Sequence, residues 1–171
     1  MEIKDLIKKG AIFVYPTDTV YGLGCNALDK KAVDKIKKIK GRDDKKPLSI
    51  IAPSNAWIHK YTKASEKAVN KYLPGKYTLI LEKKNPKFLA HVSSNNFLGI
   101  RVPKHNFTKV IQKAGLPFIT TSCNISSKKP ISSLKQLDSS ILKKVDVIVN
   151  CGKLSGTPST LVMADGTMIK R

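Results

Sequence analysis

The sequence predicts an α+β fold with three layers, in which a mixed, twisted sheet of about seven strands carries helices on both faces. Two observations lead to this prediction. Short apolar runs of strand length alternate with amphipathic segments of helix length, as they do in layered folds. Several apolar runs near the C-terminus follow one another without a helix between them, which favours a mixed sheet over a purely parallel one. Because no repeat or break divides the chain, we expect a single domain over residues 1–171.

The elements of the N-terminal half follow from apolar spacing and capping residues. Residues 2–9 place apolar side chains on one helical face and precede Gly10, which predicts a short helix. The run "AIFVY" predicts a buried strand, and the hydroxyl- and glycine-rich "PTDTVYGLG" after it predicts a loop. Asp29 can cap a helix that continues to about Ile39. A strand in "LSIIA" and a helical region over residues 55–72 come next.

The remaining elements are predicted in the same way. The runs "YTLILEK", "LGIRVP" and "PFITTS" predict strands, and "FTKVIQKAG" predicts a helix that ends at Gly115. Residues 134–144 predict the last helix. The final strands are expected in "VDVIVN", "STLVMA" and "TMIKR".

The composition is strongly basic. The 32 lysines and arginines exceed the 12 acidic residues by 20, which favours polyanionic partners such as RNA, nucleotides or acidic lipid surfaces without choosing among them. The cysteines, Cys25, Cys123 and Cys151, are odd in number and lack CxxC spacing, and no signal peptide is apparent, so we expect a reduced, cytoplasmic protein. The apolar runs are far shorter than the roughly 20 residues that span a bilayer, so we expect a soluble protein without a membrane-spanning segment.

Arginine is rare in this lysine-rich chain. Only Arg42, Arg101 and Arg171 are arginine, although 32 residues are basic. Arginine presents a planar fork of donors that grips phosphate or carboxylate at two points, whereas lysine presents a point charge. The three positions are therefore candidate anion sites. The alternative is that a lysine-rich composition leaves a few arginines at random.

Several standard sites are absent from the sequence. Neither a GxxxxGK[ST] loop, a GxGxxG turn nor a GxSxG elbow occurs, which excludes a P-loop enzyme. His59, His91 and His105 lack the spacing of a metal site, and a structural or surface role is favoured for each. What remains is a series of loops with hydroxyl, amide and cationic groups, each of which alone is explained as a turn or cap. These loops are "PTDTVYGLG", "KGR", "IRVPKH", "TTSCN" and "GTPSTLV".

Taken in order, these loops resemble the motifs of the YrdC/TsaC family, the threonylcarbamoyl-AMP synthases that begin the tRNA modification t6A. "YPTDTVYGLG" is similar to the family's PT-[DE]-T-x-YGLG, and "KGR" with "SCN" resembles its KxR…SxN signature. "LPGKYTLIL", "LGIRVPKH" and "SGTPSTLV" resemble three further segments, so the likeness runs from about Ala11 to Arg171. All three arginines fall where the family binds anions, which argues against random placement.

The resemblance implies a YrdC-like fold and a nucleotidyltransferase that makes threonylcarbamoyladenylate and pyrophosphate from L-threonine, bicarbonate or CO2, and ATP. Mg²⁺ would enter on the ATP phosphates, since no carboxylate cluster is visible to hold it. The implied ATP site comprises Lys40, Arg42, Ser122, Asn124, Ser132 and Arg171, with Lys40 and Arg42 also catalytic. The implied threonine site comprises Thr17, Tyr21, Arg101 and Ser159, with Arg101 gripping the carboxylate at two points.

The sequence also departs from the family pattern and leaves alternatives open. Ile51 stands where many members have histidine, and Pro158 where an acidic residue is usual. One alternative is the related hydrogenase-maturation carbamoyltransferase, although the acylphosphatase and zinc-finger regions of that enzyme are not found here. The other is a non-catalytic module that binds tRNA or double-stranded RNA through its positive charge. A synthase would in turn supply a downstream threonylcarbamoyl transferase.

Overall fold

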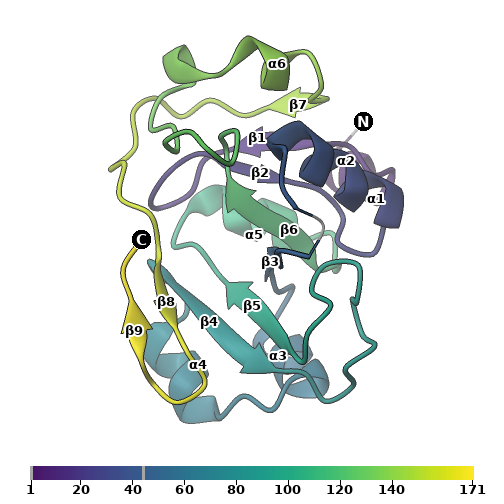
Figure 1. The fold of residues 1–171 in the computed structure, drawn as a ribbon, viewed down its shortest axis with the longest axis vertical. Helices are drawn as coiled ribbons and strands as arrows, with labels where there is room; N and C mark the ends of the chain where they lie inside the picture. Colours follow the sequence, from purple (N-terminus) through teal and green to yellow (C-terminus); the bar gives the residue numbers. More distant parts are fainter. Residues whose placement is uncertain (1, 44) are drawn as a thin grey trace.

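The computed structural model describes residues 2–43 and 45–171 and places the strands in one mixed sheet (Figure 1). The strand order is β7-β1-β2-β6-β3-β5-β4-β8-β9. The pairs β1–β7, β3–β5 and β4–β8 are parallel and the other neighbours are antiparallel, so the predicted α+β class and mixed sheet are confirmed. The strands are β1 Phe13–Tyr15, β2 Gly22–Gly24, β3 Ser49–Ile51, β4 Tyr77–Glu82, β5 Phe97–Arg101, β6 Phe118–Ser122, β7 Val147–Ile148, β8 Thr160–Val162 and β9 Met168–Ile169.

The prediction of about seven strands was wrong, because the sheet has nine. The apolar runs identified in the sequence each supply a strand, and the strand without such a run is β2. Its sequence, Gly-Leu-Gly, has low strand propensity and lies in a segment that the sequence predicts as a loop. It becomes a strand through its neighbours, since β2 pairs with β1 on one side and with β6 on the other.

The helices lie close to their predicted positions, with two differences. The helical region predicted over 55–72 is divided into two helices. Thr62 ends the first helix in an extended conformation and forms a β-bridge with Lys83. Ser65 then caps the second helix by accepting a hydrogen bond from Ala68 N. The region over 134–144 is likewise divided, and Asp138 caps its second part. The helices are α1 Ile3–Lys8, α2 Lys30–Lys40, α3 Asn55–Tyr61, α4 Glu66–Tyr72, α5 Asn106–Gln112, the 3-10 turn Leu134–Gln136 and α6 Ser139–Leu142. None of the helices described is both long enough and apolar enough to cross a membrane.

Two hydrophobic cores lie on opposite faces of the sheet. Helices α2, α3, α4 and α6 contribute to the first core, and α1 and α5 contribute to the second. Successive side chains along a strand point to opposite cores: in β1, Val14 belongs to the first core, whereas Phe13 and Tyr15 belong to the second. Helices therefore cover both faces, as the three-layer prediction requires.

Helix α2 ends where the first arginine of the sequence lies. Asp29 accepts a hydrogen bond from Ala32 N at its start, which confirms the predicted cap. At its end Gly41 has φ +58, a left-handed conformation that glycine adopts without steric cost. The helix thereby buries Lys40 in its last turn and places Arg42 just beyond it.

Candidate functional site

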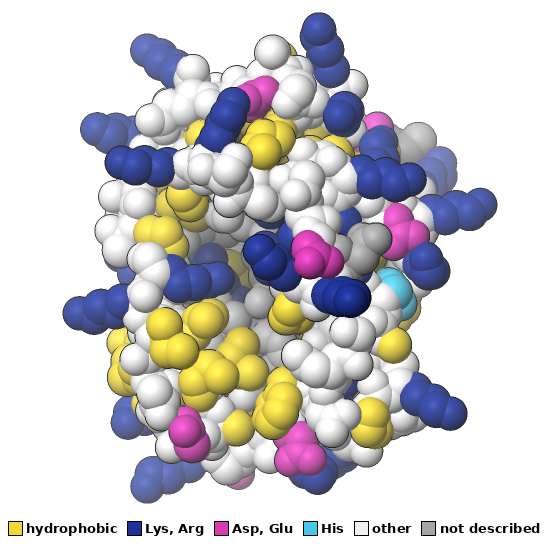
Figure 2. Space-filling model, viewed as in Figure 1, with side chains coloured by type: hydrophobic (Ala, Val, Ile, Leu, Met, Phe, Trp, Pro, Cys, Tyr) yellow, Lys and Arg dark blue, Asp and Glu magenta, His cyan; other side chains and the backbone are white. Residues whose placement is uncertain are grey.

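One cavity of about 350 Å³ brings most of the predicted site residues together. Figure 2 shows lysine and arginine side chains gathered around a hollow near the middle of this face. Its lining includes the cations Arg42, Arg101, Lys128 and Arg171, and no aspartate or glutamate of the described residues lines it. Such a lining favours an anionic ligand. Eight of the ten predicted site residues line the cavity: Thr17, Tyr21, Arg42, Arg101, Ser122, Asn124, Ser159 and Arg171.

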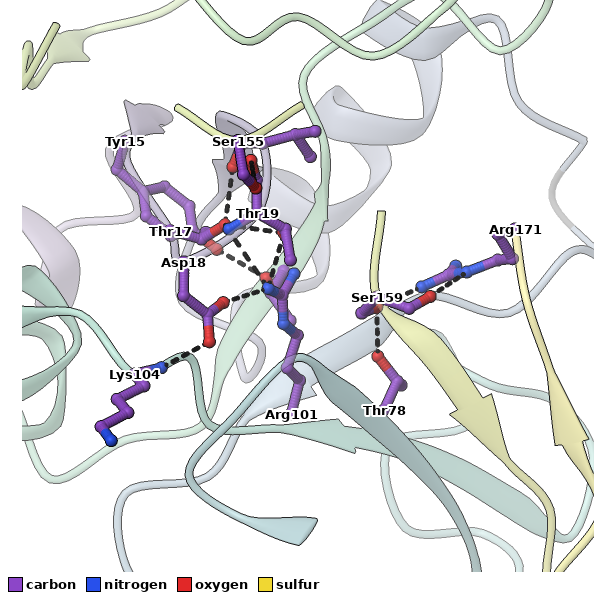
Figure 3. Close-up of polar contacts among 12 residues, drawn as sticks. Tyr15, Thr17, Asp18, Thr19, Thr78, Arg101, Lys104, Ser155, Ser159 and Arg171 are labelled. Atoms are coloured by element: carbon purple, nitrogen blue, oxygen red, sulfur yellow. Dashed lines mark hydrogen bonds and ion pairs between the residues drawn. The ribbon is translucent and has the colours of Figure 1, made fainter. Parts of the chain in front are cut away.

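Arg101, at the end of β5, is buried and held by the loop after β1 (Figure 3). Its Nη2 donates to Thr19 Oγ1 at 2.7 Å and pairs with the Asp18 carboxylate, which also accepts from Lys104 N at 2.9 Å. Its Nε is buried and has no hydrogen-bond partner among the described residues. A buried donor without a partner is costly, so it is suited to an acceptor from a ligand.

The loop after β1 has its own internal order. Thr17 Oγ1 donates to Val20 O at 2.6 Å and accepts from Thr19 N at 3.1 Å, so the hydroxyl is fixed at the cavity wall. Such local hydroxyl bonds are typical of tight turns. The loop is therefore a preformed support for Arg101.

Arg171 and Ser159 form a second group on the opposite side of the view from the Asp18 loop (Figure 3). Arg171 Nη2 donates to Ser159 Oγ at 2.6 Å and its Nε donates to Ser159 O at 3.2 Å. Ser159 Oγ also lies 2.9 Å from Thr78 Oγ1. Burial lowers the pKa of Arg171, and repulsion by Arg101 and Arg42 lowers that pKa further. The three sparse arginines thus converge on one cavity.

Arg42 is anchored to the loop that follows α2. Its Nη2 donates to Pro47 O at 2.7 Å, and Pro47 lines the cavity beside it. Burial lowers the pKa of the guanidinium. The anchoring leaves other donors of the planar fork for a ligand.

Lys40, predicted as a phosphate ligand, is buried and is not among the residues that line the cavity. The residue is 1% exposed, and its Nζ donates to Ser122 O and to the backbone and side-chain oxygens of Asn124. An ammonium has three donors, and these acceptors use all of them. Lys40 therefore fixes the loop after β6, with the motif residues Ser122 and Asn124 as its partners.

We expect the buried Lys40 to give the protein a distinct pH dependence. Burial, with a smaller contribution from Arg42, lowers the pKa of Lys40 from 10.5 to about 8. Between these pH values the unfolded state binds the proton that the folded state has released, so Lys40 contributes a rise with pH in the free energy of unfolding, of up to about 3 kcal/mol. Burial raises the pKa of Tyr15, Cys25 and Cys123, and these groups oppose the rise, so the contribution of Lys40 is measured as a difference between variants.

Urea unfolding of the wild type, Lys40→Met and the control Lys38→Met, across this pH range, measures the effect. Lys38 is an exposed lysine of the same helix. The free energy of unfolding of the wild type and of the control should rise with pH relative to that of Lys40→Met. Parallel pH profiles for wild type and Lys40→Met would contradict the assignment.

Tyr21 and Ser132 differ in their relation to the cavity. Tyr21 lines it, and its hydroxyl donates to Gly152 O at 2.8 Å and accepts from Cys151 N at 3.1 Å. Tyr21 thus holds the segment that leads from β7 toward Ser159. Ser132 does not line the cavity, and its backbone N and hydroxyl contact Gln136 Oε1 instead.

Sequence reasoning missed several residues in or beside the cavity, among them four that supply or hold its polar groups. Asp18 and Thr19 lie in "PTDTVYGLG", and Thr78 lies in "LPGKYTLIL", so motif position could have indicated them. Lys128 gave no signal, because it is one of many lysines.

The two departures from the family pattern differ in their relation to the cavity. Ile51 is fully buried in the second core and does not line the cavity. Pro158 does line it, beside Ser159. Of the two departures, the one at Pro158 therefore lies where a ligand could meet it.

The described residues hold no group of three or more histidine, cysteine, aspartate or glutamate side chains that could bind a metal ion. His91 Nε2 lies 2.8 Å from Ala27 O, and His105 Nδ1 accepts from Phe107 N at 3.1 Å. Both histidines therefore have structural partners. The chemistry of the cavity rests on cations, hydroxyls and an amide.

The fold and the cavity together define an α+β protein with an arginine-lined cavity between its strand ends and loops. The family model for Sua5, YciO and YrdC, described as telomere recombination, matches residues 5–170. The chain belongs to this family.

Individual relatives agree with this assignment. A Methanocaldococcus jannaschii protein provisionally named threonylcarbamoyl-AMP synthase is 36% identical over 171 residues, which cover 98% of this chain and 81% of the relative. The structure of Pyrococcus abyssi Sua5 complexed with L-threonine is similar, with a TM-score of 0.84, 30% identity and coverage of 95% of this chain. This chain spans only 49% of that protein. Escherichia coli YciO is similar with a TM-score of 0.83 and 27% identity, over 98% of this chain and 84% of YciO.

Proposed function

We propose that this protein is an L-threonylcarbamoyladenylate synthase, a nucleotidyltransferase that joins L-threonine, bicarbonate or CO2, and ATP and releases pyrophosphate. The observation that carries the proposal is the convergence of Arg42, Arg101 and Arg171 on one cavity that no described aspartate or glutamate lines. Relatives named threonylcarbamoyl-AMP synthase support it.

The two groups of polar residues suit the two substrates. We assign the threonine carboxylate to Arg101, whose buried Nε is a free donor, with Thr17 and Ser159 nearby in the same cavity. We assign the ATP phosphates to Arg42 and Arg171, with Ser122 and Asn124 beside them. Mg²⁺ would arrive with the phosphates as part of the nucleotide substrate.

The proposed reaction needs positioning more than acid or base groups. The threonine amine adds to CO2 and loses a proton, which forms a carbamate. A carbamate oxygen then attacks the α-phosphorus of ATP, and the bond to the pyrophosphate oxygen breaks. Fixed cations stabilise the charge on the phosphates in this step and need no covalent enzyme intermediate. The product is consumed by a transferase that modifies tRNA.

The experiment is to incubate purified protein with MgATP, L-threonine and labelled bicarbonate, and to measure labelled threonylcarbamoyladenylate and pyrophosphate. Product should require threonine. We expect Arg42→Ala to reduce the rate by about 100-fold or more, since it removes a preorganised donor at the phosphates. The control Lys45→Ala removes the same charge from an exposed neighbour. Folded protein that makes no product but binds tRNA in a steeply salt-dependent way would favour the RNA-binding alternative instead.

A further inference from the structure

We propose that Lys128 is a further phosphate-binding residue of this cavity and recognises the polyphosphate chain of the nucleotide. This proposal rests on the proposed function. Lys128 lines the cavity together with Arg42 and Arg171, and no described aspartate or glutamate lines it. A lysine ammonium is a compact donor that binds phosphate as a point charge.

The backbone of Lys128 is fixed by the buried motif residues. Asn124 Nδ2 donates to Ile125 O at 2.9 Å and to Lys128 O at 2.7 Å. Lys128 N in turn donates to Ile125 O at 2.8 Å, which closes a tight turn. Asn124 itself is held by Lys40 Nζ at 3.2 Å from Oδ1. The buried cation of Lys40 therefore supports the turn, and this turn includes Lys128 in the lining of the cavity.

The side chain of Lys128 is free to exchange its partner. Its Nζ lies 2.7 Å from Asp138 Oδ2, and the lysine side chain is 64% exposed. Exposed ion pairs of this kind contribute little to stability. The other oxygen of Asp138 caps α6 by accepting from Ser140 N at 2.9 Å and from Ser140 Oγ at 2.6 Å. Lys128 can leave Asp138 without removing that cap.

The chemistry of Lys128 selects phosphate over the other parts of the substrates. An ammonium has three donors and no acceptor, so it cannot distinguish one base from another. A polyphosphate carries several negative charges and is a stronger partner than the single carboxylate of Asp138. Arg101 and its loop already supply the donor assigned to the threonine carboxylate.

Calorimetric binding of MgATP and of inorganic tripolyphosphate to the full chain tests this role without requiring turnover. We expect Lys128→Ala to raise the Kd of both ligands about tenfold, as the loss of one charged hydrogen bond predicts. Lys129→Ala is the matched control: Lys129 is the exposed neighbour, carries the same charge and does not line the cavity. Asp138→Asn should bind both ligands at least as tightly as the wild type, because it releases Lys128.

The outcomes separate this proposal from the proposed function. Equal affinities in Lys128→Ala and Lys129→Ala, with tight binding by the wild type, would overturn the role of Lys128 and leave the synthase proposal standing. Weakening by Asp138→Asn to the level of Lys128→Ala would also overturn it, because the ion pair would then act structurally. Tripolyphosphate binding that depends on Lys128, in a protein that makes no product, would support Lys128 while the synthase proposal fails. Wild-type protein that binds neither ligand would overturn both.

Discussion

Replacing Arg101 with lysine is expected to weaken L-threonine binding by about 10- to 150-fold, although the positive charge is kept. The expected loss is about 1.5–3 kcal/mol for a hydrogen bond between charged groups in a buried site. The geometry gives the reason. Nη2 of Arg101 is already used by Asp18 and Thr19, so the donors left for the ligand are on Nη1 and the buried Nε. Lysine has a single nitrogen and cannot serve the loop and the ligand from two positions on a planar group.

Calorimetric titration of L-threonine into the wild type and Arg101→Lys measures this loss. Lys104→Arg is the matched control, since it makes the reverse exchange at an exposed residue whose backbone, and not its side chain, contacts Asp18. The unfolding midpoint of each variant should be measured alongside, so that a folding defect is recognised. Threonine affinity that is unchanged in Arg101→Lys would refute the assignment of the carboxylate to this residue.

The rarity of arginine was the most informative local signal for the candidate site. In a chain with 32 basic residues, the three arginines are far apart in sequence and meet at one cavity. Composition alone could not show this, but it did select the residues whose planar donors suit anions. The motif order then placed Thr17, Ser159 and their neighbours with them.

The role of Lys40 could not be predicted from the sequence. A lysine beside an arginine in a glycine-containing turn has the same pattern whether it faces a ligand or the interior. Only the tertiary structure shows that its ammonium meets Ser122 O and Asn124, which lie some eighty residues further along the chain. Lys128 was hidden for the same reason, because its position depends on the turn that Asn124 holds.

The fold was predictable where local signals and tertiary structure agree. Apolar runs gave the strands, and Asp29 with Gly41 marks the two ends of α2. The prediction failed at β2, where pairing with β1 and β6 overrides the weak strand propensity of Gly-Leu-Gly. Glycine in this segment predicts a loop that a ligand can approach closely, whereas in the structure Gly24 allows two strands to approach each other.

Replacing Gly24 with alanine is expected to lower the free energy of unfolding by about 3 kcal/mol or more. A β-carbon at this position would lie 2.2 Å from Ile119 O and 2.3 Å from Phe118 Cε1. The first contact is with backbone of β6, which cannot move aside, because Ile119 N donates to Cys25 O at 2.8 Å. The glycine is therefore required for the close approach of β2 to β6.

Gly115→Ala is the control for this prediction, and urea unfolding of both variants is the measurement. Gly115 has φ +70, but a β-carbon at this position would meet open space, so alanine there suffers only backbone strain, about 1–2 kcal/mol. The difference between the two variants isolates the steric contact at Gly24. Equal losses would mean that β6 can yield at Ile119. Since β2 begins at Gly22 in the cavity wall and β6 ends there at Ser122, a larger loss in Gly24→Ala would show that the two strands which form this part of the wall require the close approach at Gly24.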